Sequence, residues 1–258
     1  MFAVVTRISC APVKGLSLTH PAEIELEQDG MRENRRFYLI GETGRLVNGK
    51  ALGTLTQVVA ESDADGTMLV LRFPGGDVAA GGLGLGSAVE TNFYGRRVTG
   101  RVVEGPWAAA LSEFAGARLR LIRADEAGAG SDRGARAAVS LVSAASLQRL
   151  AAEAGVASVD DRRFRMLFTI DGVAEHDEDG WVGREVRVGD AVVRWRGLVG
   201  RCAVTTQDPD TGVPTLDTLR LLRAYRGDLP TDEPLPFGIW GEVVAPGRVR
   251  LGDVVEPL

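Results

Sequence analysis

The sequence predicts an α+β fold that is predominantly β and is arranged as two domains, and three observations support this prediction. Short runs of β-branched or alternating apolar residues, bounded by turn residues, occur along most of the chain. Only a few segments have the apolar spacing of a helix. The chain has 258 residues, of which 45% are hydrophobic, so it is long enough to bury two cores of ordinary size.

The first half is predicted to consist mainly of strands, which form a β-rich domain over residues 1–123. One short helix interrupts them, because Pro106 can open it and Trp107 and Leu111 then share one face. Gly116 follows at the position where a left-handed residue commonly ends a helix. The predicted strands are residues 2–9, 22–27, 36–40, 58–61, 68–73, 96–103 and 118–123.

Residues 124–136 are predicted to be a linker or mobile loop between the domains. The segment is small, polar and rich in glycine, and it has no apolar periodicity. The second domain is therefore expected to span residues 137–258.

The second domain is predicted to combine strands with two helices. Ser143 suits the N-cap of the first helix, and Gly155 suits the residue after its end. The second helix is expected to begin near Thr215 and to stop at Gly227. The predicted strands are residues 163–170 and 186–195, and the Val-Arg-x-Gly-Asp of residues 186–190 recurs at 249–253. We interpret this repeat as two similar hairpin corners in one barrel.

The charge and composition exclude several classes of function. The net charge is −5 and the sequence pI is about 5.3, so the chain repels polyanions and is not expected to bind nucleic acid. No apolar stretch is long enough to direct export or to span a membrane. We therefore expect a cytoplasmic protein without a membrane partner.

The few cysteines and histidines restrict the metal chemistry. Cys10 and Cys202 are far apart in sequence, and His20 and His176 have no ligand-like spacing with them. This arrangement indicates neither a disulfide framework nor a zinc site of the usual kind, and an iron–sulfur cluster requires four thiolates. Any functional thiolate in this chain acts alone.

The segment from Gly200 to Gly212 is the strongest candidate for chemistry. Arg201 places a positive charge beside Cys202, which favours the thiolate form. The Val-Thr-Thr that follows is typical of a strand, and the Asp-Pro-Asp-Thr-Gly after it is typical of a turn. From these residues alone, Cys202 is either a metal-binding thiolate or a small buried side chain in a strand.

The same segment resembles MOSC domains. Arg-Cys-x-x-Thr-Thr-x-Asp-Pro-Asp-Thr-Gly at 201–212 is followed, as in that family, by a leucine-rich helix and by Pro-Gly-Arg-Val-Arg-Leu-Gly-Asp at 246–253. The first half resembles the family's N-terminal β-barrel domain through Pro-Val-Lys-Gly at 12–15 and Arg-Arg-Phe at 35–37. The resemblance implies two barrels, the second with a few peripheral helices.

The resemblance also implies a molybdenum cofactor, molybdopterin, whose metal is bound by Cys202. Molybdenum accepts soft sulfur donors, so one protein thiolate is enough. Lys14 and Arg36 would bind the phosphate of the cofactor as a point charge and a bidentate fork. Asp208 is either a turn residue or a proton donor near the metal. The other expected cofactor-binding residues are Ser143, Arg165, Arg201 and Thr205.

The sequence departs from the family pattern at several positions. Val199 stands where many relatives have a second cysteine, and Gly15 stands where a serine is common. Met166 and Leu167 occupy the place of an asparagine. Because these changes remove polar contacts to the cofactor, we expect the affinity for it, or the accepted substrate, to differ.

We expect an enzyme, an oxidoreductase that removes an oxygen atom from a small N-hydroxylated or N-oxide substrate. The chain has neither four thiolates nor a flavin or nicotinamide motif, so an external protein would donate the electrons. One alternative is a non-catalytic protein that binds the cofactor or carries a persulfide on Cys202. A thiol hydrolase is a weaker alternative, because neither histidine has the context of a partner base. At family level, the resemblance extends to pyridoxal phosphate binding.

Overall fold

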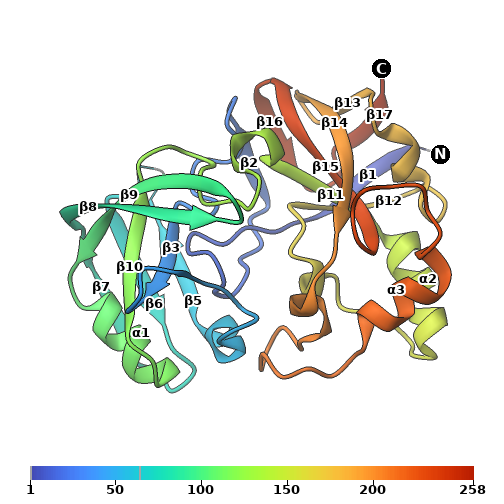
Figure 1. Ribbon diagram of the computed structural model, residues 1–258. Helices are drawn as coiled ribbons and strands as arrows, with labels where there is room; N and C mark the ends of the chain where they lie inside the picture. The colour runs from blue at the N-terminus through green and yellow to red at the C-terminus, as the bar shows by residue number, and fades with distance from the viewer. Residues whose placement is uncertain (1, 64) are drawn as a thin grey trace.

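The computed structural model describes residues 2–63 and 65–258, and most of its elements are strands. Figure 1 shows two lobes side by side. One lobe contains β3 to β10 with α1, and the other contains the remaining strands with α2 and α3. The predicted class, α+β and predominantly β, is confirmed. None of the described helices has the length and apolar character needed to cross a bilayer.

Seven strands close into a barrel in the C-terminal lobe. Their order is β1 (Ala3–Ile8), β12 (Phe168–Asp171), β11 (Val139–Ser143), β15 (Pro236–Ala245), β14 (Ala191–Gly200), β13 (Glu185–Val188) and β17 (Val254–Pro257). Neighbours are antiparallel except β11 and β12, which are parallel. Alternate side chains point inward, so Val5, Trp195 and Ile239 share one buried core.

The first strands of the chain belong with the C-terminal half. β1 pairs with β12 and β17, and β2 (Glu23–Leu26) pairs with β16 (Gly247–Arg250). We expected both strands in the N-terminal domain, whereas their strand partners lie in the C-terminal half. The alternating pattern of a strand predicts which face it buries but does not identify its neighbour.

The two repeated Gly-Asp turns lie against each other at one end of the barrel. The Gly189 amide donates to the Val254 carbonyl at 3.1 Å, and the Asp190 amide donates to the Arg248 carbonyl at 2.9 Å. The first turn joins β13 to β14 as a hairpin, as predicted. The second is not a hairpin, because β16 pairs with β2 while β17 pairs with β1 and β13.

Two sheets and a helix share the core of the N-terminal lobe. The first sheet is β4 (Leu46–Val47), β3 (Phe37–Gly41), β10 (Leu119–Ala124), β9 (Arg96–Glu104) and β8 (Gly84–Phe93), and the second is β5 (Val59–Ser62), β6 (Met68–Arg72) and β7 (Val78–Gly82). The helix is α1 (Trp107–Ala115), which ends at a left-handed Gly116 as predicted. Trp107 anchors it, since its buried indole donates to the Leu69 carbonyl at 3.0 Å.

The segment predicted as a linker covers the other face of the five-stranded sheet. Ala129 packs against a second apolar cluster that includes Tyr38 and Phe93. Arg96 holds the segment in place by donating to the carbonyls of Ala129 at 2.5 Å and of Ser131 at 2.6 Å. The 125–138 segment is thereby held against the N-terminal lobe.

Both predicted helices of the C-terminal half are present, and they pack together. Ser143 caps α2 (Ala144–Ala154) by accepting from the Ser146 amide at 3.1 Å, and Gly155 ends the helix, as predicted. α3 (Thr218–Arg226) begins later than expected. Asp217 caps it by accepting from the Arg220 amide at 3.1 Å, which fixes the start after Thr215.

Candidate functional site

Cys202 follows the end of β14, and its thiol is exposed. We predicted a strand after it, but residues 203–206 form a 3-10 turn, η5 (Ala203–Thr206). Thr205 explains the difference, because its hydroxyl donates to the Cys202 carbonyl at 3.0 Å and bonds Thr218 Oγ1 at 2.6 Å. Of the two interpretations of Cys202, the small buried side chain is therefore excluded. That description fits Cys10, which is buried.

The segment after Cys202, residues 203–214, packs on the N-terminal lobe. Gly53 and Gly212 approach so closely that a Cβ atom on either would collide with the backbone of the other. Figure 1 shows this orange segment beside η1 (Gly53–Gln57) at the boundary of the lobes. The thiol is thus held at the junction of the two lobes.

Three cations from both lobes gather at this junction, and we call Lys14, Arg35 and Arg165 the basic cluster. The Lys14 Nζ lies 2.5 Å from Asp132 Oδ1. The Arg35 Nη2 donates to the Arg165 carbonyl at 3.0 Å, and the Arg165 Nη2 donates to the Leu16 carbonyl at 2.8 Å. These bonds join the N-terminal lobe to Arg165 of the C-terminal half.

Burial and mutual repulsion shape the basic cluster. Burial lowers the pKa of Lys14, although Asp132 opposes this. Burial, followed by repulsion from Arg35, lowers the pKa of Arg165 to about 9, so it stays cationic at neutral pH. Partial burial would raise the pKa of Asp132, but Lys14 and Arg35 hold it below its ordinary value. Three cations face one carboxylate within the described residues, which leaves an excess of positive charge for an anion.

Strained backbone is concentrated at the same place. Non-glycine residues rarely adopt a positive φ, and those that do often lie at functional sites. Within residues 2–63 and 65–258 they are Arg35 (55°), Tyr94 (53°), Arg165 (52°), His176 (62°) and Leu235 (50°). Two of these belong to the basic cluster, and Tyr94 lies close enough to Asp132 and Cys202 to feel their charge.

Arg165 does not lie in a strand, as we had predicted for residues 163–170. A 3-10 turn, η3 (Asp161–Phe164), ends at the left-handed Arg165, and β12 begins at Phe168. The prediction failed because Phe164, Met166 and Leu167 are all buried, which imitates the apolar run of a buried strand. The turn directs Arg165 toward the other lobe.

Tyr94 reaches the junction from the tip of the β8–β9 hairpin, which points toward the C-terminal lobe (Figure 1). The Asn48 side-chain amide donates to the Tyr94 Oη at 2.9 Å, so the phenol keeps its own hydrogen for another acceptor. Burial raises the pKa of Tyr94, and the proximity of Cys202 adds to this. The carbonyl of Gly49, the residue after Asn48, accepts from Gln207 Nε2 at 2.7 Å. This bond connects the Asn48 segment to the segment that follows Cys202.

Arg36 does not reach the basic cluster. Its Nη2 lies 3.4 Å from the Asp125 carbonyl, and its closest charged neighbours include Arg123 and Arg32. Arg35, the residue before it, reaches the cluster in its place. The sequence contains both arginines in one motif, and Arg35, whose backbone is left-handed, is the one whose side chain reaches Arg165 at the junction.

Arg201 and Ser143 are buried in structural roles. The Arg201 guanidinium donates to the carbonyls of Phe237 at 2.8 Å and Phe164 at 3.0 Å, and burial lowers its pKa to about 9. Ser143 is fully buried and caps α2 through the Ser146 amide. Together with the buried Thr205, these residues support the fold around the thiol, and their expected contact with the cofactor stays a prediction.

Asp208 stabilises the turn that follows Cys202. Its Oδ1 accepts from the amides of Asp210 and Thr211, both at 3.0 Å. Of the two roles left open by the sequence, the turn role is the one that these contacts show.

A small hollow lies between the two lobes beside the basic cluster. It is lined by Arg165, by Ser17 and Thr56 of the N-terminal half, and by Val204 and Gln207 of the segment after Cys202. Arg165 is the member of the basic cluster that lines this hollow, and Val204 and Gln207 bring to it the segment that follows Cys202.

Comparisons with known proteins agree with this architecture. The family model for the MOSC domain matches residues 125–256, and the model for the MOSC N-terminal beta barrel domain matches residues 2–116. The chain is 36% identical over 98 residues to mitochondrial amidoxime-reducing component 1 of Mus musculus. It is 35% identical over 99 residues to mitochondrial amidoxime reducing component 2 of Homo sapiens.

These matches are partial. Each covers 36% of this chain, but only 28% of the mouse protein and 29% of the human one. Among solved structures, the YUAD protein from Bacillus subtilis is similar over 100% of this chain and 96% of its own, with 12% identity and a TM-score of 0.48. Because the MOSC model alone covers more than half of the chain and the N-terminal model covers most of the rest, this chain belongs to the MOSC domain family.

Proposed function

We propose that this protein is a molybdenum-cofactor-dependent oxidoreductase in which Cys202 binds the metal. One observation carries the proposal: an exposed cysteine lies at the same lobe junction as a cluster of one buried and two half-buried cations. The relatives named for amidoxime reduction favour a small N-hydroxylated or N-oxide substrate.

The residues at the junction fit such a cofactor. A thiolate is the soft donor that molybdenum accepts, and the cofactor would bring its other sulfur ligands itself. Within the described residues, Arg35 and Arg165 each use one guanidinium N–H in a hydrogen bond to a carbonyl. A guanidinium has five N–H donors, so both arginines retain donors for a phosphate.

Each part of the junction has a separate task in this proposal. When bound, the cofactor would supply the two-electron chemistry that removes an oxygen atom from the substrate. Cys202 would hold the metal, and the basic cluster would hold and orient the phosphate end. The Tyr94 phenol, which accepts from Asn48, would donate its hydrogen bond into the space between the lobes.

The electrons would come from an external protein. The chain has two cysteines, so it cannot build a four-thiolate cluster by itself, and it has no recognisable flavin or nicotinamide motif. A ferredoxin-like or flavin-dependent donor fits this requirement.

The experiment that tests the proposal measures metal, pterin and turnover on freshly purified protein. We expect about one molybdenum and one pterin per chain, as a single thiolate ligand predicts. We also expect turnover of an amidoxime with an artificial electron donor. Bound cofactor without turnover of any N-oxygenated compound would support the carrier alternative, and absence of both molybdenum and pterin would contradict the proposal.

The role of Tyr94 has its own test. Tyr94→Phe removes the hydroxyl and keeps the ring, so kcat should fall by about 10- to 100-fold, while molybdenum and pterin content stay unchanged. Asn48→Ala leaves the phenol in place and should have a smaller effect. An unchanged kcat for Tyr94→Phe would remove the tyrosine from the mechanism.

A further inference from the structure

Asp132 and Lys14 form an ion pair with very unequal exposure. The Lys14 side chain is 10% exposed, whereas the Asp132 side chain is 60% exposed. If the pair separates, the carboxylate can be solvated where it stands, but the buried ammonium is left without a counter-charge. Lys14 therefore requires an anion, and Asp132 is the partner that another anion can replace.

The backbone around Asp132 is fixed by contacts that do not involve its carboxylate. Arg96 binds the carbonyls of Ala129 and Ser131 on one side. On the other side, the Arg133 Nη2 lies 2.5 Å from Glu233 Oε1. Rotation of the Asp132 side chain away from Lys14 therefore leaves these bonds intact, and loss of its charge does not release the segment.

The charge of the basic cluster exceeds what one carboxylate neutralises. Lys14, Arg35 and Arg165 all lie within electrostatic range of Asp132, which carries a single negative charge. A phosphate monoester carries about −1.5 to −2 at neutral pH and offers three strong acceptor oxygens. It is thus a better partner for three cations than Asp132, whereas an anion of one charge gains little by replacing it.

We propose that Asp132 is an internal counter-ion of Lys14 that a doubly charged phosphate monoester replaces in the basic cluster. A monoester displaces the carboxylate from Lys14, and a singly charged anion does not. This inference rests on the proposed function, because the terminal phosphate of the cofactor would be such a monoester.

The test uses two probes that differ mainly in charge: methyl phosphate, a dianion at pH 8, and dimethyl phosphate, a monoanion. Calorimetric titration at fixed ionic strength measures their affinities for protein freed of bound cofactor. In the wild type we expect methyl phosphate to bind about tenfold more tightly or better. In Asp132→Asn methyl phosphate should bind about tenfold more tightly than it does to the wild type, because the competing carboxylate is gone, and dimethyl phosphate should gain less because it carries a smaller charge.

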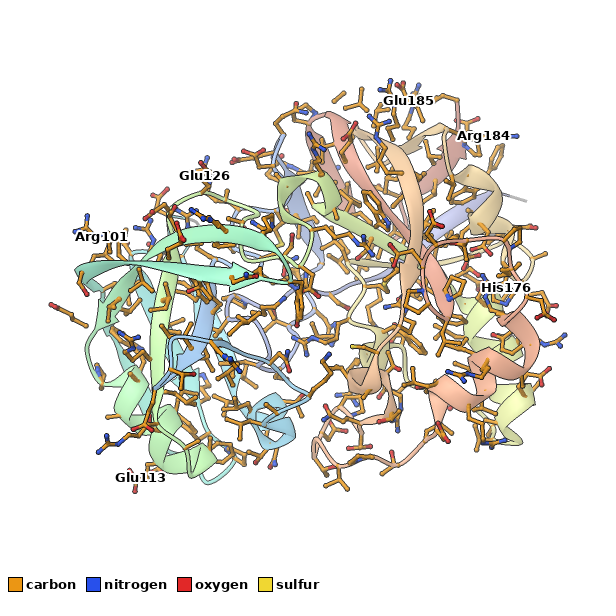
Figure 2. The ribbon with its side chains drawn as sticks, viewed as in Figure 1. Arg101, Glu113, Glu126, His176, Arg184 and Glu185 are labelled. Carbon is orange, nitrogen blue, oxygen red and sulfur yellow. The ribbon has the colours of Figure 1, made fainter. Side chains whose placement is uncertain are left out.

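Two further variants keep the test specific. Glu126→Gln changes the net charge equally at an exposed position of the same segment, where Figure 2 shows Glu126 at the outer edge of the lobe. It should leave both affinities within about twofold of the wild type, as expected for a screened surface charge. Asp132→Glu restores the charge and should restore the wild-type affinities. A thermal melt of each variant verifies that it is folded.

Several results would overturn the inference. They are an Asp132→Asn variant with wild-type affinities, a Glu126→Gln variant that behaves like Asp132→Asn, or no binding of either probe to either protein. Molybdenum and pterin are measured on the same preparations before the cofactor is removed. Their absence would refute the proposed function, whereas the phosphate titrations would still decide the role of Asp132.

Discussion

Two polar regions of this molecule both contain buried ionisable groups, and they differ in access. The first is the lobe junction with the basic cluster and Cys202. The second, which we call the sealed cluster, consists of Ser146, His176 and Glu178 beside α2 and α3. Figure 2 shows His176 near these helices, away from the junction. Both regions contain a left-handed residue and buried ionisable groups.

The sealed cluster satisfies part of its polar groups internally, while His176 Nε2 and Glu178 Oε2 have no hydrogen-bond partner among the described residues. The Ser146 hydroxyl donates to Glu178 Oε1 at 2.7 Å and lies 3.2 Å from His176 Nδ1. Glu178 is fully buried, and its Oε1 also accepts from the Ser143 amide at 3.1 Å. At the junction, by contrast, the thiol is exposed and the guanidinium groups keep free donors. Polar residues therefore do not mark a ligand site by themselves, because a ligand also needs access to them.

The largest effect expected at the junction comes from Cys202→Ala. Loss of the metal ligand should lower activity by about 1,000-fold or more and bring molybdenum content to background. Because the thiol is exposed, the free energy of unfolding should change by less than about 0.5 kcal/mol.

Cys10→Ala is the matched control for that variant. Cys10 is buried and contacts Thr19 Oγ1 at 3.2 Å, so its loss should cost about 1 kcal/mol of stability and leave activity and metal content unchanged. Metal analysis, turnover and denaturant unfolding on both variants separate the two roles. A Cys202→Ala protein that retains molybdenum and activity would show that Cys202 is not the metal ligand and that the junction is no more a ligand site than the sealed cluster.

The next largest effect is expected from Arg165→Met, which keeps the aliphatic stem and removes the guanidinium. A hydrogen-bonded charge contributes about 1.5–3 kcal/mol, so pterin retention should weaken by about 10- to 100-fold. Arg36→Met is the control, because Arg36 lies outside the basic cluster. Pterin content measured after dialysis distinguishes the two variants. Equal losses of pterin in both would indicate that Arg36 also binds the cofactor.

The sealed cluster should respond to pH, whereas Arg165 stays charged across the neutral range. Burial, with Arg226 and Arg149 nearby, lowers the pKa of His176 to about 4. The unfolded histidine, with a pKa of about 6.5, then binds more protons than the folded one between pH 6.5 and 4. Stability therefore rises with pH across this window and is lost as the pH falls.

His176→Asn should remove that dependence, since asparagine tolerates the left-handed backbone. When the pH falls from 7 to 4, the free energy of unfolding of the wild type should decrease by about 2 kcal/mol more than that of the variant, after a discount for the partial exposure of His176. Burial raises the pKa of Glu178, which acts in the opposite direction but is present in both proteins and cancels to first order. Denaturant unfolding at several pH values measures the difference, and parallel curves would show that His176 does not titrate in this window.

Much of the fold was predictable from local patterns. Pro106 and Gly116 bracket α1, and Ser143 and Gly155 bracket α2, because caps and left-handed ends depend on a few neighbouring residues. The membership of β1 in the barrel was not predictable, since its partners β12 and β17 are distant in sequence.

Three residues that the sequence assigned to the site, Cys202, Lys14 and Arg165, lie at one lobe junction in the structure, and their roles stay predictions. Arg35 was missed because its backbone is left-handed, and the residue types of the motif do not predict this conformation. Tyr94 was missed because it comes from a hairpin tip in the other lobe, and its proximity to the thiol exists only in three dimensions.

Ser143→Ala has the smallest expected effect, and it tests whether the sealed cluster is separate from the ligand site at the junction. We expected Ser143 to contact the cofactor, but it is fully buried and accepts from the Ser146 amide at 3.1 Å as the cap of α2. Removing a serine N-cap typically costs about 1 kcal/mol, so the free energy of unfolding should fall by that amount while pterin content and kcat stay unchanged. Pterin loss without a stability loss would instead place Ser143 at the ligand, and the sealed cluster would then have to open toward the junction.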